Sequence, residues 1–94
     1  MHDKEYYQIL LEELKRRQLD LVLIVLKREL AHYELEKTYK KGEIMGLTDE
    51  PDFKVLKNMI NHQVNHLKLL RTELDDIDLD IEHCEFMIGR LNNR

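Results

Sequence analysis

The chain of 94 residues contains very few of the residues that end helices or form tight turns. It has one Pro and three Gly, together with no Trp, two Phe and four Tyr. This scarcity disfavours a β-sandwich, whose many turns need Gly, Pro and Asn. The single Cys84 excludes a disulfide framework. Charge is abundant instead, at 36% of residues against an ordinary value of about 25%, and this composition predicts an all-α fold of long helices.

The net charge of −4 comes entirely from the second half of the chain. Residues 1–47 hold nine basic and nine acidic side chains, whereas residues 48–94 hold six basic and ten acidic ones. Proteins that grip nucleic acid through its phosphates carry a clustered basic face. We therefore expect no direct nucleic-acid binding.

No segment of the sequence has the composition of a signal peptide or a membrane span. The start, residues 1–5, lacks a basic region followed by an apolar core. The longest apolar run is Leu21 to Leu26, whereas a span needs about 20 residues. Together with an unpaired Cys, this predicts no membrane partner and a cytoplasmic location, in a bacterial cell or a phage-infected host.

The rare helix-ending residues gather in the middle of the chain. Gly42 fits the left-handed position after a first helix, Thr48 or Asp49 can cap a second helix, and Pro51 suits its first turn. The predicted elements of a single domain, 1–94, are a helix over about 4–41, a loop over 42–49 and a helix over about 50–91.

Heptad spacing is strongest in the second predicted helix. Twelve positions follow alternating steps of three and four, and Gln63 alone is polar. An apolar seam sustained in this way predicts an antiparallel coiled-coil hairpin, and it outweighs a short strand-like alternation over residues 76–82. The seam consists of Phe53, Leu56, Ile60, Gln63, Leu67, Leu70, Leu74, Ile77, Ile81, Cys84, Ile88 and Leu91.

The first predicted helix has two apolar stripes on nearly opposite faces. Since a second helix covers only one face, the other stripe predicts self-association into a homodimer, a four-helix bundle. The stripe predicted to face the second helix is Tyr7, Leu11, Leu14, Gln18, Leu21, Val25, Arg28, His32, Leu35 and Tyr39. The stripe predicted for self-association is Leu19, Leu23, Leu26, Leu30 and Tyr33.

An acidic block without Lys or Arg occupies the second predicted helix. A hairpin register in which paired residue numbers add to about 95 places this block opposite Lys15, Arg16 and Arg17. The block then fixes the register by charge matching, forms a partner-binding surface, or holds a divalent metal ion. The block is Glu73, Asp75, Asp76, Asp78, Asp80, Glu82 and Glu85. The predicted partner-binding residues are Asp75, Asp76, Asp78, Leu79, Glu82 and Phe86.

The same register brings Glu29, His32, His62 and His66 near one another, around Gln63. We interpret this group mainly as a polar layer in which His32 and His62 share hydrogen bonds. The alternatives are a zinc-like site, for which these four residues are weak candidates, and a pH-sensitive interface.

Nothing in the sequence has the pattern of a catalytic site. Cys84 lies at a seam position without a resolving Cys, and helices packed along their length predict no concave pocket. We expect no cofactor and no enzymatic activity. The predicted function is a small regulator, inhibitor or adaptor that binds an unidentified partner protein. An acidic nucleic-acid mimic of the phage anti-defence type is the alternative, and a metal-binding helical bundle is the third hypothesis.

Overall fold

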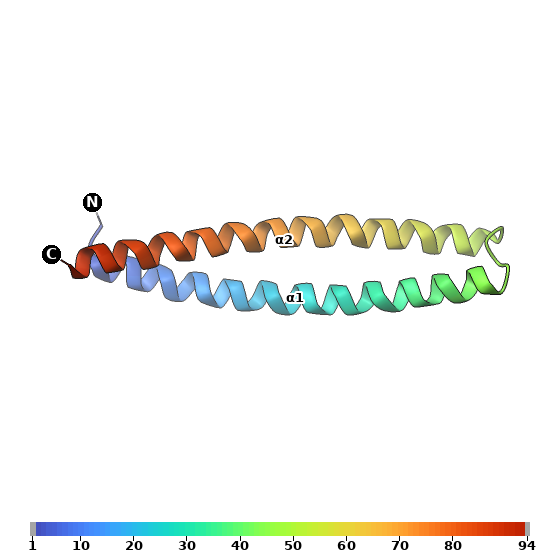
Figure 1. Cartoon of the computed structure of the whole chain (residues 1–94), viewed down its shortest axis with the longest axis horizontal. Helices are drawn as coiled ribbons and strands as arrows, with labels where there is room; N and C mark the ends of the chain where they lie inside the picture. The colour runs from blue at the N-terminus through green and yellow to red at the C-terminus, as the bar shows by residue number, and fades with distance from the viewer. Residues whose placement is uncertain (1, 94) are drawn as a thin grey trace. The chain divides into compact units, whose positions relative to one another are not determined.

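The computed structural model of this chain describes residues 2–93 and is all-α. Helix α1 is Lys4–Ile44 and helix α2 is Pro51–Asn92, with one short loop between them (Figure 1). No strand occurs among the described residues, and the strand-like alternation at 76–82 lies inside α2. The prediction of two long helices is confirmed.

Residue contacts divide the chain into two compact units, and each helix contributes to both. Unit 1 combines residues up to Leu23 with those from Arg71 onward, and unit 2 is Ile24–Leu70. Unit 1 is therefore an antiparallel pair of helical segments. Unit 2 is a helix–loop–helix.

The predicted seam forms the core of each unit. All twelve seam positions of α2 are buried or half-buried, and so are all positions of the facing stripe of α1 except the exposed Arg28. Burial of apolar surface contributes about 25 cal/mol per Å², so this seam is the main stabilising contact. In unit 1 the buried hydrophobic residues are Leu21, Ile77, Ile81 and Cys84, and in unit 2 they are Val25, Phe53 and Leu67.

The end of α1 differs from the prediction, because Gly46 rather than Gly42 takes the left-handed conformation. Gly46 has φ of 74°, and the Leu47 N–H donates to the Gly42 carbonyl at 2.9 Å while the Gly46 N–H donates to Glu43 at 3.1 Å. These two bonds form the Schellman motif. The helix thus continues three residues beyond the predicted end.

Gly42 is required for packing instead. A Cβ at Gly42 would overlap the ring of Phe53, which is buried and stacks on Tyr39 with 4.5 Å between ring centroids. The absence of a side chain lets the two helices of unit 2 approach closely beside the loop.

Asp3 caps the start of α1, and the cap of α2 differs from the prediction. The Tyr6 N–H donates to Asp3 Oδ1 at 2.9 Å, which satisfies a free donor of the first turn. Pro51 is the first residue of α2, as predicted. The residue before it is Glu50, whose carbonyl accepts from the Phe53 N–H at 3.0 Å. Thus neither Thr48 nor Asp49 occupies the cap position.

Gly42→Ala tests the packing at Phe53. We expect a net loss of about 1–2 kcal/mol in the free energy of unfolding, because the added methyl overlaps the buried Phe53 ring. Urea denaturation monitored by circular dichroism measures it.

Gly89→Ala is the matched control, because this glycine lies in α2 and, apart from its chain neighbours and the backbone of its own helix, nothing lies within 4 Å of the position that an added Cβ would take. Replacing a glycine in a helix by alanine should stabilise the protein by about 0.5–1 kcal/mol. Equal stabilisation by both substitutions would contradict the close approach at Gly42.

Candidate interaction surfaces

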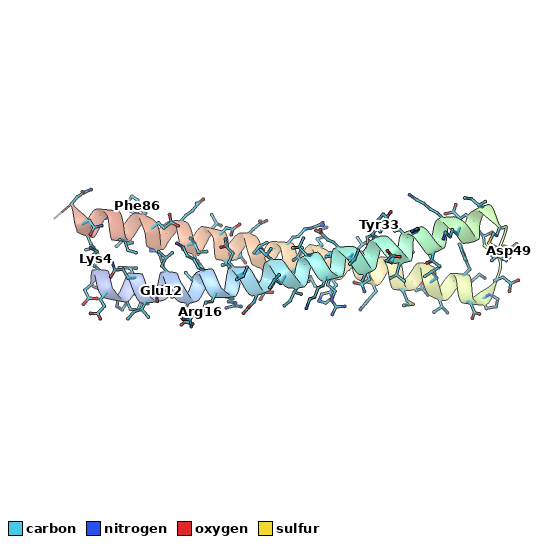
Figure 2. All side chains as sticks on the ribbon, turned by 90° about the horizontal axis from the view of Figure 1, so that it is seen from below. Lys4, Glu12, Arg16, Tyr33, Asp49 and Phe86 are labelled. Atoms are coloured by element: carbon cyan, nitrogen blue, oxygen red, sulfur yellow. The ribbon has the colours of Figure 1, made fainter. Side chains whose placement is uncertain are left out.

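The predicted self-association residues of α1 are all exposed. Unit 1 exposes Leu19 and Leu23, and unit 2 exposes Leu26, Leu30 and Tyr33, with exposed fractions from 48% to 63%. Figure 2 shows Tyr33 on the side of α1 that faces away from α2. Large apolar side chains at heptad spacing on an outer face are typical of a helix that packs against another chain.

Each unit exposes large apolar side chains. Among the described residues, the exposed large apolar side chains outnumber the buried ones. The intramolecular seam therefore leaves much apolar surface in contact with water.

Two members of the acidic block bind side chains of α1 within unit 1. The Arg17 guanidinium Nη2 donates to Glu73 Oε1 at 3.2 Å, and Gln18 Nε2 donates to Asp78 Oδ1 at 2.6 Å. The first pair is exposed and the second is partly buried. Asp78 lies next to Ile77, the residue predicted opposite Gln18, so the predicted register is close to the observed one.

Fewer basic side chains of α1 pair with the acidic block than predicted. Arg16 forms an exposed pair with Glu13 of its own helix at 3.5 Å and does not reach α2 in the described structure. Asp78, one of the predicted partner-binding residues, is half-buried and accepts a hydrogen bond from Gln18.

The other five predicted partner-binding residues are exposed on unit 1. They are Asp75, Asp76, Leu79, Glu82 and Phe86. Figure 2 shows Phe86 on the side of α2 that faces away from α1. Within residues 2–93, the carboxylates of Asp75, Asp76 and Glu82 form no salt bridge.

The four weak metal-ligand candidates do not form a ligand set. His62 is exposed, whereas Glu29, His32 and His66 are half-buried. His32 Nε2 lies 2.9 Å from Glu36 Oε1, one turn along the same helix. No group of three or more metal-binding side chains occurs in the described part of the chain. The predicted convergence of these residues is wrong, because His32 binds within its own helix.

A polar layer is present, but it differs from the predicted one. His32 Nδ1 and Gln63 Oε1 are buried and lack hydrogen-bond partners in the structure of residues 2–93. His62 is exposed and does not share a bond with His32. Polar groups at seam positions specify the alignment of the helices at some cost in stability.

Unit 2 also contains a surface cleft that the sequence did not indicate. Its volume is about 390 Å³, at the lower end of ligand-pocket sizes. The lining carries carboxylates and ammonium groups but no His, Ser or Cys. The lining residues are Glu36, Tyr39, Lys40, Glu43, Lys57, Ile60 and Asn61. No sequence signal marks it, because both helices contribute.

Cys84 is the most deeply buried side chain of unit 1, at 1% exposure. Burial, and then the negative charge of Asp80, raises the pKa of its thiol. A protonated and inaccessible thiol is a poor nucleophile, so Cys84 acts as an apolar core residue.

The fold and these surfaces define a class: an all-α protein of two long helices with apolar and acidic outer faces. No family profile, curated protein or solved structure matches the chain. Among the described residues, neither helix is long and apolar enough to cross a membrane.

Double-mutant cycles should separate the two cross-helix pairs. For Gln18→Ala with Asp78→Ala we expect a coupling of about 1–2 kcal/mol, since the bond is partly buried and its acceptor is charged. For Arg17→Ala with Glu73→Ala we expect at most about 0.5 kcal/mol, because both groups are exposed and screened. Urea denaturation provides the values, and the reverse order would contradict the assigned burial.

Cys84 should react slowly with alkylating reagents in the folded protein. We expect alkylation by iodoacetamide to be at least about 100-fold slower than in guanidinium chloride, since it requires opening.

The raised pKa of Cys84 predicts how the stability of the fold changes with pH. Its contribution to stability is complete below the unfolded pKa of about 8.5 and is lost as pH rises through the folded value. The free energy of unfolding should therefore fall more steeply above pH 8.5 in the wild type than in Cys84→Ala. Equal slopes would show that the thiol titrates normally in the fold.

Proposed function

We propose that this protein is a non-enzymatic interaction module that homodimerises through the outer face of α1 and binds a partner protein. The observation that carries the proposal is the set of exposed residues Leu19, Leu23, Leu26, Leu30 and Tyr33. Their heptad spacing suits knobs-into-holes packing against the same helix of a second copy, which would give a four-helix bundle. Such a module acts as a regulator, inhibitor or adaptor by occluding or bridging its partner.

A symmetric dimer is supported by the unpartnered apolar face of α1. The five exposed side chains of this face would be buried in an interface of standard size, on the order of 800 Å² per partner. In an isologous interface the same apolar face serves both chains. One face of this kind is sufficient to close the assembly.

The acidic mimic of nucleic acid receives less support than the interaction module. Glu73 and Asp78 bind Arg17 and Gln18 of the same chain, so part of the acidic block serves the fold. The remaining carboxylates flank exposed apolar side chains, which a phosphate backbone does not imitate.

Leu23→Glu combined with Leu26→Glu tests the dimer. We expect the wild type to have about twice the monomer mass of 11.4 kDa by light scattering, and the variant to be a monomer with a lower melting temperature, because the proposed interface would bury two added charges per chain. The melting temperature of the wild type should also rise with protein concentration.

Leu79→Glu combined with Phe86→Glu is the matched control, since these residues are similarly exposed but lie on α2. This variant should remain a dimer. A wild-type monomer whose melting temperature does not depend on concentration would overturn the proposed self-association, even if the first variant fails to fold.

A further inference from the structure

The outer face of α2 in unit 1 carries two large apolar side chains that the seam does not use. Leu79 is 62% exposed and Phe86 is 63% exposed, and they lie seven residues apart. Residues at this spacing occupy the same side of a helix, two turns apart. This is the spacing of the anchor residues by which a helix packs against a partner.

Three of the four surface neighbours of the first anchor, Leu79, are carboxylates. On a helix, the surface neighbours of Leu79 are three and four residues away, and they include Asp75, Asp76 and Glu82, all exposed. Within residues 2–93 none of the three forms a salt bridge. The neighbourhood is therefore an apolar anchor inside a rim of negative charge that the chain itself does not neutralise.

A glycine adjoins the second anchor. Gly89 is three residues after Phe86 inside α2, and apart from its chain neighbours and the backbone of its own helix nothing lies within 4 Å of the position that its Cβ would take. Glycine inside a helix costs stability, and here no packing within the described structure requires it. Its lack of a side chain leaves room beside Phe86 for the close approach of another backbone.

A second copy of the same face is a poor occupant. In an isologous contact this face would meet itself, and the rims of Asp75, Asp76 and Glu82 would repel each other. A partner with positive charge along the edges of an apolar stripe satisfies both features, because cations meet the rim and apolar residues meet Leu79 and Phe86.

We propose that this face, formed by Asp75, Asp76, Leu79, Glu82, Phe86 and Gly89, binds a cationic amphipathic helix of a partner protein. The inference rests on the proposed interaction role and specifies the chemistry of its partner. The apolar stripe of the partner helix packs between Leu79 and Phe86 and approaches the backbone at Gly89.

The probe is a synthetic 21-residue peptide of Leu and Lys, with Leu at heptad spacing. A peptide of the same composition with scrambled order is its control. Titration calorimetry on the full chain should show saturable binding of the first peptide, weakened at least about tenfold from 50 to 300 mM NaCl. The scrambled peptide should bind at least about tenfold more weakly, because it lacks an apolar stripe.

Three sets of variants locate the binding. Leu79→Ser with Phe86→Ser should weaken binding about tenfold or more, whereas Val55→Ser with Met59→Ser, at similarly exposed positions of unit 2, should change it less than about twofold. Gly89→Ala should weaken binding while raising the melting temperature.

The role of the acidic rim is tested with two variants that each lose three carboxylates and so have equal net charge. Asp75→Asn, Asp76→Asn and Glu82→Gln together should weaken binding more than the exposed set Glu12→Gln, Glu34→Gln and Glu43→Gln.

Unchanged affinity in the Leu79/Phe86 variant, or equal losses in the two charge sets, would overturn the proposal, because the peptide would then bind through general charge. Dissociation of the Leu79/Phe86 variant into monomers would also overturn it, by showing that a second copy covers this face. A wild-type monomer that binds the peptide as expected would refute the proposed dimer and support this face.

Discussion

The whole arrangement depends on one constraint: two helices packed along a single seam can bury only one face each. The seam of α2 has one such face, and the structure buries or half-buries every position of it. Helix α1 has two apolar faces, and α2 covers the facing stripe except Arg28, whereas the five leucine and tyrosine residues of the other face stay exposed. The exposed leucines of α1 are thus a direct consequence of the seam, and they are the basis of the proposed dimer.

Polar residues interrupt the seam in both units, with different results. In unit 1, Gln18 reaches Asp78 and a charged acceptor satisfies it. In unit 2, His32 Nδ1 and Gln63 Oε1 are buried without partners among the described residues. Polar groups at core positions specify the alignment of helices at a cost in stability. The bond between Gln18 and Asp78 therefore specifies alignment at a lower cost in stability than His32 and Gln63 do.

Features that arise from a local, periodic pattern could be predicted from the sequence. Features that depend on side-chain geometry could not. The seam and the exposed face of α1 follow from heptad spacing, because a regular helix converts spacing directly into direction. The alternative of a zinc-like site has no ligand set among the described residues, because pairing residues by number ignores where each side chain points. His32 found a partner one turn along its own helix, in Glu36. Likewise, the sequence showed that Asp78 was acidic but not that Gln18 would bind it.

The sequence by itself determined that the chain forms two helices, which residues line the seam, and that α1 has an apolar face α2 cannot cover. The tertiary structure decided which of two nearby glycines takes the left-handed conformation. Both suit a helix end locally, and the close packing of Phe53 on Gly42 distinguishes them. It also decided which carboxylates serve the fold, and it formed the cleft beside Tyr39. These features depend on how two helices meet, and the spacing within one helix does not specify them.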